Sequence, residues 1–477
     1  MPLSIATLLR LTLTLLLSLA MPSVSYAGGL IRDAEIEHYL RHLSSPVWTA
    51  AGLEPQAVSI FIIDDDSINA FVAGGSNIFF HTGLLLATDT PEMLIGVIAH
   101  ETGHIAGGHL ARGAEQVARA QIGAVISFVL GAAAAASGAG DAGAAILSAG
   151  PHVAERGLLA FTRANEQAAD QAGLSYLETL HLTPEGMLNM FERLRRDEKR
   201  FLGTPDPYAL THPLTKERIS SIRSHVAQSP YREATLPAND QIMHQRMQAK
   251  LYGYMRPLVQ VQSRYIDASQ PSRYARAVAY YRASDLPKAL QEIDSLLTEQ
   301  PNDAYFHELK GQMLFENGRI KESREQYQKA SQLAPDSALL RSDYARTLLA
   351  SPTTPTLRVE AIALLERASR QDPSYNASWR LLAEAYGKAG EEGKAHLALS
   401  EEAAMRDDAT AMRIQANLAL ETLPSGSPAY LRAQDIKRFA IRREQEKKDE
   451  GGPFLTGQSS EFLSPFTRHH HSLSPSY

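Results

Sequence analysis

The chain has 477 residues, of which 44% are hydrophobic and 21% charged, and its formal net charge is −6. This length predicts two domains. The negative charge argues against a nucleic-acid partner, because such binding needs a basic face that this composition does not suggest. There is no cysteine, which excludes a disulfide framework and a lipid-anchoring cysteine. This absence is compatible with an oxidising periplasm without demonstrating it.

Residues 1–27 have the features of a signal peptide. Arg10 is followed by an apolar core from Leu11 to Ala20, and small residues before Gly28 suit cleavage there. Arg10 is the only charge ahead of that core, so an uncleaved anchor is the alternative. We expect the mature chain to be periplasmic, in a Gram-negative bacterium.

Short strands are predicted next. The apolar run Val58–Ile63 ends at the acidic triplet Asp64–Asp66, which we interpret as a solvated turn and not as a calcium site. Gly74-Gly75 stands between Ala70–Val72 and Asn77–Phe80, and this pattern predicts a hairpin.

A His-Glu-x-x-His signature follows inside a predicted helix. Thr90 is a candidate N-cap and Pro91 suits the first helical position. His100 and His104 are four residues apart and project from one face, the spacing with which two imidazoles bind zinc. Glu101 beside them is the candidate general base. The alternative is two core histidines and a solvated glutamate, which would bury polar groups without evident partners.

A strand near such a metal site can bind an extended substrate by adding it as a further strand. We assign that role to the region from Asn77 to His81. His81 itself is interpreted as a polar residue at the end of a strand and not as a ligand.

An apolar, small-residue segment follows from Ile122 to Leu159. Its first run, Ile122–Ala136, is shorter than the about 20 residues that span a membrane, and Ser137–Asp141 interrupts the pattern. One interpretation is a buried helical hairpin. The other is a mobile lid over the zinc cleft that leans on an unfolded client or makes a peripheral membrane contact.

The third zinc ligand distinguishes the classes of zinc peptidase. One class places a histidine where this chain has Leu110, and His109 falls one residue early, about 100° off the required face. A glutamate from a downstream helix is the other solution. Glu166 and Asp170 are four residues apart, so Glu166 can complete the shell while Asp170 orients a ligand histidine. A solvated helix face is the alternative.

His212 and Arg218 are the last features of the first domain. Thr215 is a candidate cap of the helix that contains Arg218, whose guanidinium can reach a carboxylate near the site. His212, on the preceding loop, could approach the open zinc position. There it would be a fourth ligand in the resting state or would stabilise the oxyanion. An ordinary surface-loop histidine is the alternative.

The second half has the period of a helical repeat. Pro301, Pro335 and Pro373 follow one another at intervals of 34 and 38 residues, and the extra four match an insertion at Ser351–Pro355. Thirty-four residues is the period of tetratricopeptide (TPR) repeats. Stacked repeats form a concave surface, so this half is expected to bind protein.

These motifs together resemble one family of zinc peptidases, the CAAX-prenyl-protease-like and HtpX-like family. The resemblance rests on His100–His104, on Asn165–Asp170 and on Ser67–Gly75. Within the family, the chain is most similar to the soluble periplasmic, BepA-like branch, which carries a C-terminal TPR domain. The resemblance covers roughly residues 30–410. Ala168 departs from the family pattern, which often has glutamate there, but that position is not a ligand.

The resemblance implies a role for each matching residue. It implies His100, His104 and Glu166 as ligands of one Zn²⁺ per subunit, Glu101 as catalytic base, and Asp170 as the partner of a ligand.

The expected fold is α+β, with a gluzincin-type metalloprotease domain that is mostly helical with a small sheet, followed by an all-α TPR solenoid. The expected boundaries are a signal peptide at 1–27, the protease domain at 28–255, the TPR domain at 268–440 and a disordered tail at 441–477. The run His469–His471 in that tail is expected to bind metal only adventitiously.

The expected function is a periplasmic zinc endopeptidase. The resemblance implies misassembled outer-membrane β-barrel proteins as substrates, and the β-barrel assembly machinery as the partner of the TPR domain. The competing hypothesis is a chaperone or adaptor whose zinc site is latched or structural. The intact Glu101 argues against that hypothesis, because a structural zinc site would not need it.

Overall fold

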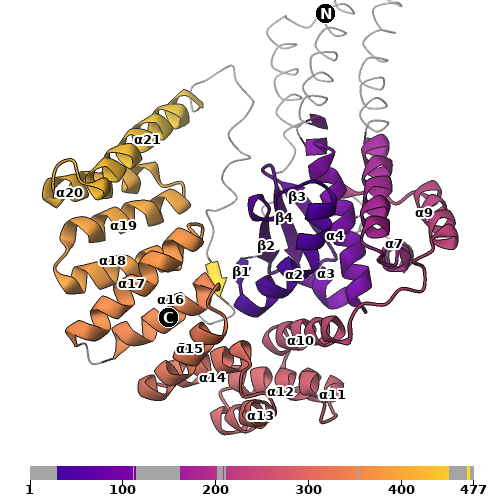
Figure 1. The fold of residues 1–477 in the computed structure, drawn as a ribbon, viewed down its shortest axis with the longest axis horizontal. Coiled ribbons are helices and arrows are strands. Elements are labelled where there is room, and N and C mark those ends of the chain that lie inside the picture. The colour runs from indigo at the N-terminus through magenta and orange to yellow at the C-terminus, as the bar shows by residue number, and fades with distance from the viewer. Residues whose placement is uncertain are drawn as a thin grey trace, which may run out of the picture.

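The computed structural model describes residues 29–110, 112–113, 162–200, 208, 211–351, 354–450 and 470–472. A mixed first part holds a small sheet with helices, and an all-helical second part curves beside it as a superhelical arc (Figure 1). The expected α+β class with a helical solenoid is confirmed.

The sheet has the strand order β3-β4-β2-β1-β5. Its strands are β1 (Leu30–Arg32), β2 (Ser59–Ile63), β3 (Ala70–Ala73), β4 (Asn77–His81) and β5 (His470–Ser472). The predicted hairpin around Gly74-Gly75 is confirmed, because β3 and β4 pair antiparallel. β2 runs parallel to β4 and antiparallel to β1.

The role that we expected for the region from Asn77 to His81 is wrong. β4 is hydrogen-bonded to β3 on one side and to β2 on the other, so it has no edge to offer an extended substrate. Among the strands that the structure describes, β3 is the outermost on that side.

Helices cover the sheet and build most of the first part. They are α2 (Ala34–Ala50), η1 (Pro55–Ala57), α3 (Thr82–Ala87), α4 (Pro91–Ala106), a helix over residues 162–179, α7 (Glu185–Arg200) and α9 (Lys216–Gln228). Their apolar faces form one core with the sheet, in which Trp48, Phe80 and Phe191 are fully buried. Burial of such large aromatic side chains is a major source of stability.

The helix over residues 162–179 lies against α4 at backbone distance, because two glycines face the contact. A Cβ on Gly103 would lie 2.7 Å from the carbonyl oxygen of Ala169. A Cβ on Gly173 would lie 3.1 Å from the carbonyl oxygen of Ala99. This close approach sets side chains of the two helices face to face.

The second part is built of antiparallel helix pairs. Its helices are α10 (Ala238–Met255), α11 (Leu258–Arg264), α12 (Gln270–Arg282), α13 (Leu286–Glu299), α14 (Ala304–Glu316), α15 (Ile320–Leu333), α16 (Ala338–Ala350), α17 (Pro355–Gln371), α18 (Asn376–Ala389), α19 (Glu392–Met405), α20 (Ala409–Thr422) and α21 (Pro428–Glu450). α10 packs against α12, and the arc continues to α21 (Figure 1). Within one repeat, Gly311 makes room for the ring of Tyr327, because a Cβ there would lie 2.9 Å from it.

The turns between repeats share one hydrogen bond. The carbonyl of Pro301 accepts a bond from the side chain six residues later, His307, at 2.9 Å. The carbonyl of Pro373 accepts one from Trp379, also at 2.9 Å, and the carbonyl of Pro335 accepts one from Arg341. This contact satisfies a carbonyl near each helix start, so the periodic prolines mark a structural joint.

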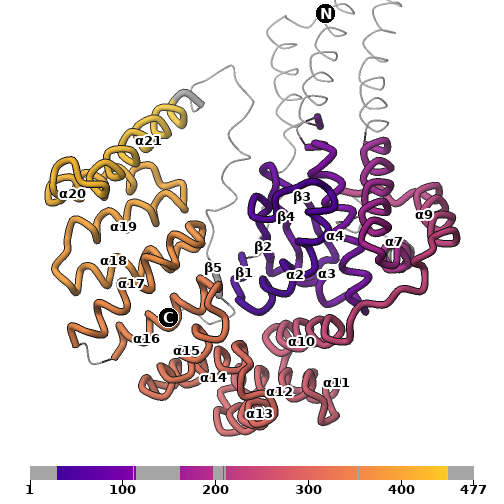
Figure 2. The backbone as a smooth tube through the Cα atoms, viewed as in Figure 1, coloured from indigo at the N-terminus to yellow at the C-terminus, as the bar shows by residue number. Residues whose placement is uncertain are grey.

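The start of the first part is joined to the solenoid by ion pairs, and β1 lies on the side of its sheet that faces the arc (Figure 2). Lys250 of α10 is buried, with its Nζ 2.7 Å from Asp33 and 3.1 Å from Glu308 of α14. Arg32, at the end of β1, lies 2.5 Å from Asp372, just beyond α17. Charges that are out of water need such partners, so these pairs fix how the two parts meet.

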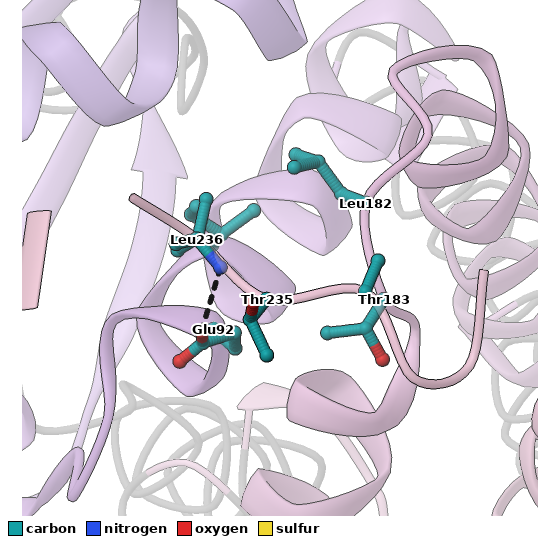
Figure 3. Close-up of a pocket in the computed structure, with 7 residues that line it drawn as sticks. Glu92, Leu182, Thr183, Thr235 and Leu236 are labelled. Carbon is teal, nitrogen blue, oxygen red and sulfur yellow. Dashed lines mark hydrogen bonds between the residues drawn. The ribbon is translucent and has the colours of Figure 1, made fainter. Parts of the chain in front are cut away.

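A shallow pocket of about 210 Å³ lies at the start of α4 (Figure 3). The carboxylate of Glu92 in its wall accepts hydrogen bonds from the backbone N–H of Leu236 at 3.3 Å and from the amide of Gln241 at 3.0 Å. The carboxylate of Glu92 therefore already has hydrogen-bond partners within the chain. His100 and His104 lie toward the other end of the same helix.

Several expectations lie outside the described residues. These are the signal peptide at 1–27, the segment Ile122–Leu159 and most of the tail. The helix α21 continues to Glu450, past residue 441 where we expected the tail to begin. Among the helices that the structure describes, none combines the length and the apolar character needed to cross a membrane.

We expect Asp372→Asn to lower the free energy of unfolding at pH 7 by about 1.5–3 kcal/mol, the range for hydrogen bonds to charged groups. Burial raises the pKa of Asp372, but Arg32 outweighs it and holds that pKa below its ordinary value. The lost stabilisation is therefore fully present above about pH 4 and disappears as the pH falls through the folded pKa.

Urea unfolding of both proteins between pH 7 and pH 3 measures this difference. Asp435→Asn is the control, because its pair with Arg438 is exposed on both sides and should change stability by less than about 0.5 kcal/mol. Equal stability of Asp372→Asn and the unchanged protein at pH 7 would contradict the expectation.

Candidate metal centre

The helix α4 presents the His-Glu-x-x-His residues to the interior. The predicted start is confirmed: Thr90 is the N-cap, its side chain accepts from the N–H of Met93, and Pro91 is the first helical residue. His100 and Glu101 are fully buried and His104 is 7% exposed. A capped and apolar helix therefore holds two imidazoles and a carboxylate inside the domain.

The helix over residues 162–179 supplies the two predicted carboxylates. Glu166 and Asp170 lie on its buried face, 3% and 2% exposed. Glu166 reaches between the two histidines, with its oxygens 3.4 Å from Nε2 of His100 and 3.3 Å from Nε2 of His104. The glycine contacts between the helices make this approach possible.

The loop before α9 brings His212 to the same place. Its backbone N–H donates to the carbonyl of Tyr208 at 2.7 Å, and the two rings stack with centroids 4.7 Å apart. Thr215 is the N-cap of α9, as predicted, and its side chain accepts from the N–H of Arg218. Although it lies on a loop, His212 is 5% exposed, which excludes a surface histidine.

Four side chains, His100, His104, Glu166 and His212, each offer one ligand atom within 4.8 Å of the others. The separations are 3.1 Å for His100–His104, 3.3 Å for His100–His212 and 3.2 Å for His212–Glu166. Donor atoms at about 2.0–2.1 Å from one tetrahedral ion lie about 3.3–3.4 Å apart. The spacing of the donors therefore fits a single metal ion.

The charges of the site also fit a divalent cation. Glu101, Glu166 and Asp170 are all buried, and Arg218 is the cation among them. When imidazoles bind a metal they are neutral, so one guanidinium leaves two of the three carboxylates unbalanced, and a divalent cation would supply that charge. Without a metal, the carboxylates of Asp170 and Glu166 outweigh burial and raise the pKa of His100 to about 9, so that its imidazolium partly replaces the missing charge. Burial, with the neighbouring imidazoles, lowers the pKa of His104 to about 3.

Arg218 and Asp170 hold the outer side of the cluster. Arg218 donates to both oxygens of Asp170, at 2.7 and 2.8 Å, and its Nη1 lies 2.8 Å from Glu166. The other side of Asp170 faces His100, with Oδ1 at 3.0 Å from Nδ1. Burial raises the pKa of Asp170, but the bonds from Arg218 outweigh it and the pKa is lowered. The carboxylate is therefore charged and can orient the ligand imidazole.

Glu101 differs from its neighbours in having no hydrogen bond. Among the described residues neither of its oxygens has a hydrogen-bond partner, and Nε2 of His212 lies 3.6 Å from Oε1. Burial raises the pKa of its carboxyl group. A buried carboxylate with a raised pKa and no partner is costly for folding, and such groups mark functional sites.

Two further residues at the cluster were not assigned a role from the sequence. Tyr208 stacks on His212, and only its one-turn spacing from that residue could have indicated it. His109 lies with its Nδ1 2.9 Å from Nδ1 of His104. The sequence presents His109 only as a histidine one residue away from a possible ligand position. In the structure it contacts His104 on the side that faces away from the cluster. Burial lowers the pKa of its imidazole.

The other polar residues singled out in the sequence lie away from the cluster. His81 ends β4, and its Nδ1 is 2.8 Å from the hydroxyl of Ser67, in agreement with a structural role. Asp66 of the acidic triplet accepts two hydrogen bonds from Arg256. Among the described residues, the cluster around His100 is the only group that could hold a metal ion.

Comparison with known proteins gives one family and several relatives. Residues 31–226 match the family model described as peptidase family M48. The beta-barrel assembly-enhancing protease of Yersinia pestis is 27% identical over 76% of this chain and 75% of its own. A Vibrio cholerae relative is 28% identical over 82% of this chain and 79% of its own. The mitochondrial metalloendopeptidase OMA1 of Schizosaccharomyces pombe is 28% identical over 41% of this chain and 55% of its own.

We expect Glu166→Ala to remove metal and activity together, because it deletes a donor of the cluster. Asp170→Asn keeps the shape but removes the charge behind His100, and should weaken metal affinity by about 10 to 100-fold. Competition with a chromophoric chelator measures both affinities. Glu178→Gln is the matched control, since Glu178 lies on the same helix and pairs with His225, outside the cluster. Full metal content in both test variants would remove these carboxylates from the site.

Proposed function

We propose that this chain, whose residues 31–226 match the model of peptidase family M48, is a zinc-dependent endopeptidase of the periplasm. It would act in the quality control and assembly of outer-membrane β-barrel proteins. The observation that carries the peptidase chemistry is the buried, unpartnered carboxylate of Glu101 beside the four-donor cluster. A chain that only bound or braced other proteins would have no use for this costly group.

The proposed ligands are His100, His104 and Glu166. Two imidazoles and a carboxylate suit zinc, which takes three protein donors in catalytic sites and keeps a fourth position open. Bound zinc supplies polarisation of the scissile carbonyl and of the attacking water. Asp170 would hold the ring of His100 in place through its Nδ1, while Arg218 holds Asp170.

Glu101 is the proposed general base. It would take a proton from the attacking water as the oxygen forms a bond to the scissile carbonyl carbon. As the C–N bond breaks, the same carboxyl group would pass this proton to the leaving amine, so that one water and one peptide bond give an acid and an amine. The raised pKa brings Glu101 closer to the working pH, at which a base and an acid are both effective.

His212 is the proposed latch of the site. Its Nδ1 lies at ligand spacing from His100 and from Glu166. With His212 in that position, four protein donors would hold the zinc, and no position would remain for water. The resting enzyme would therefore be closed, and displacement of His212 would open the fourth position.

The proposed substrate and the proposed periplasmic location rest on other observations. The relative from Yersinia pestis is a beta-barrel assembly-enhancing protease by name, and it aligns with the solenoid as well as the peptidase domain over 76% of this chain. The predicted signal peptide at 1–27 supports export. The concave solenoid would dock protein partners, and we infer that the β-barrel assembly machinery is one of them.

The second candidate function is a chaperone or adaptor with a latched site. The position of His212 favours it, since a permanently closed site would leave only the binding activity. Glu101 argues against it. The two functions can also coexist in one chain, with proteolysis released only when His212 moves.

We expect Glu101→Gln to abolish cleavage of casein while the purified protein keeps its zinc, because the amide cannot take the proton. A chelator should abolish cleavage by the unchanged protein, and added zinc should restore it. Glu192→Gln, a partly exposed position on α7, is the control and should cleave normally. Cleavage that survives both the chelator and Glu101→Gln would refute the peptidase mechanism, and no cleavage by the unchanged zinc-loaded protein or by His212→Ala would favour the chaperone.

We expect His212→Ala to raise the basal rate of casein cleavage, because the latch is gone and water can enter. The metal coordination spectrum should indicate three nitrogen donors and one carboxylate in the unchanged protein. In His212→Ala it should indicate two nitrogen donors and one carboxylate. If His212 instead stabilises the oxyanion, the same variant should lose about 10² to 10³-fold in kcat. An unchanged rate with an unchanged spectrum would leave His212 without either role.

A further inference from the structure

His109 lies just outside the donor cluster and touches it through one atom pair. Its Nδ1 is 2.9 Å from Nδ1 of His104, and the two rings are edge to face with centroids 4.9 Å apart. His109 is only 6% exposed. The other nitrogen of His104, Nε2, faces His100 and Glu166 within the cluster. The imidazole of His104 therefore has one side for the metal and the other for His109.

Two glycines bring His109 back over the end of α4. The helix ends at Ala106, and Gly108 has φ +61°, the left-handed conformation that favours glycine. The ring of His109 then lies over Gly107, where a Cβ would be 2.5 Å from its Nε2. Its spacing alone would direct His109 away from the face that carries His100 and His104. The turn at Gly108 instead brings its ring into contact with His104.

Only one placement of the hydrogen between the two rings is compatible with metal binding through Nε2 of His104. When Nε2 of His104 gives its lone pair to a metal, the ring must carry its hydrogen on Nδ1. That N–H points at Nδ1 of His109, which must accept, so His109 carries its own hydrogen on Nε2. The reverse arrangement would place the hydrogen of His104 on Nε2 and exclude metal.

We propose that His109 is a positioning residue, which fixes the tautomer and the orientation of His104 as a metal ligand by accepting a hydrogen bond from it. This inference rests on the metal centre proposed above. It gives the two ligand histidines different outer partners, a charged carboxylate behind His100 and a neutral imidazole behind His104. A neutral acceptor raises the basicity of a ligand less than a carboxylate does, so His104 is the weaker of the two donors.

Three substitutions at His109 test the acceptor. His109→Leu fills similar space without an acceptor and should weaken zinc affinity by about 10 to 100-fold, the usual effect of losing such a partner. His109→Asn places its Oδ1 near the position of Nδ1 and should keep the affinity within about threefold. His109→Asp offers a charged acceptor and should bind zinc at least as tightly as the unchanged protein. Chelator competition measures each affinity, and Arg112→Ala, on the same turn and exposed, is the control.

A second pair of variants leaves the imidazole intact. Gly107→Ala should displace the ring of His109, because of the 2.5 Å contact, and weaken the affinity as His109→Leu does. Gly113→Ala is the matched control, since a Cβ there meets nothing within 4 Å. Circular dichroism shows which variants fold. If neither His109→Leu nor Gly107→Ala folds, the Asn and Asp variants decide, and a large loss of affinity in both contradicts the proposal.

The visible spectrum of the cobalt-loaded protein separates positioning from a structural role. His109→Leu should shift the d–d bands while His109→Asn keeps them, because only the acceptor orients the ligand ring. Unchanged affinity and unchanged bands in His109→Leu would overturn the role of His109 and leave the metal centre standing. Failure of the unchanged protein to bind zinc or cobalt would overturn both.

Discussion

The constraint on which the site depends is the neutralisation of buried charge. Three carboxylates, Glu101, Glu166 and Asp170, lie inside the first part with one guanidinium, Arg218. Burying unbalanced charge is costly, so the charge of such a site is balanced either by a bound cation or by protonation of its members, as the raised pKa values of His100 and Glu101 indicate. One divalent cation held by the donor cluster meets this condition. The capped helix α4 and its glycine contacts with the helix over residues 162–179 hold the donors at the spacing that such an ion needs.

The same constraint governs the junction with the solenoid. Lys250 is fully buried, and it is tolerated because Asp33, Glu35 and Glu308 surround it. Asp33 also caps α2, whose N-terminal turn it satisfies by accepting from Ile36. α2 packs against α4. The junction between α14 and α10 is therefore connected through α2 to α4, the helix that carries His100 and His104.

Local sequence patterns predicted most residues of the site. The features that they did not predict depend on contacts between residues far apart in the sequence. The cap at Thr90, the i,i+4 spacing of His100 and His104, and the Glu166–Asp170 pair follow from neighbours in sequence. The outermost strand could not be predicted, because β2, upstream of the hairpin, pairs parallel with β4 and leaves β3 outermost on that side. His109 was excluded as a ligand by helical spacing, correctly, yet the left-handed turn at Gly108 returns it to the site. The periodic prolines predicted the solenoid. The ion pairs of Lys250 could not be predicted, because its partners are 58 to 217 residues away along the chain.

In the proposed mechanism, His212 would link the fourth position of the metal to the surroundings of Glu101. Its Nδ1 faces the donors, and its Nε2 lies 3.6 Å from Oε1 of Glu101. A ring bound through Nδ1 carries its hydrogen on Nε2, directed toward Glu101, so it also stabilises the ionised carboxylate. When the ring leaves, Glu101 loses that neighbour and gains room for water at the same moment. In the proposed mechanism, one movement of this side chain would thus open the metal position to water and free Glu101 to act as the base.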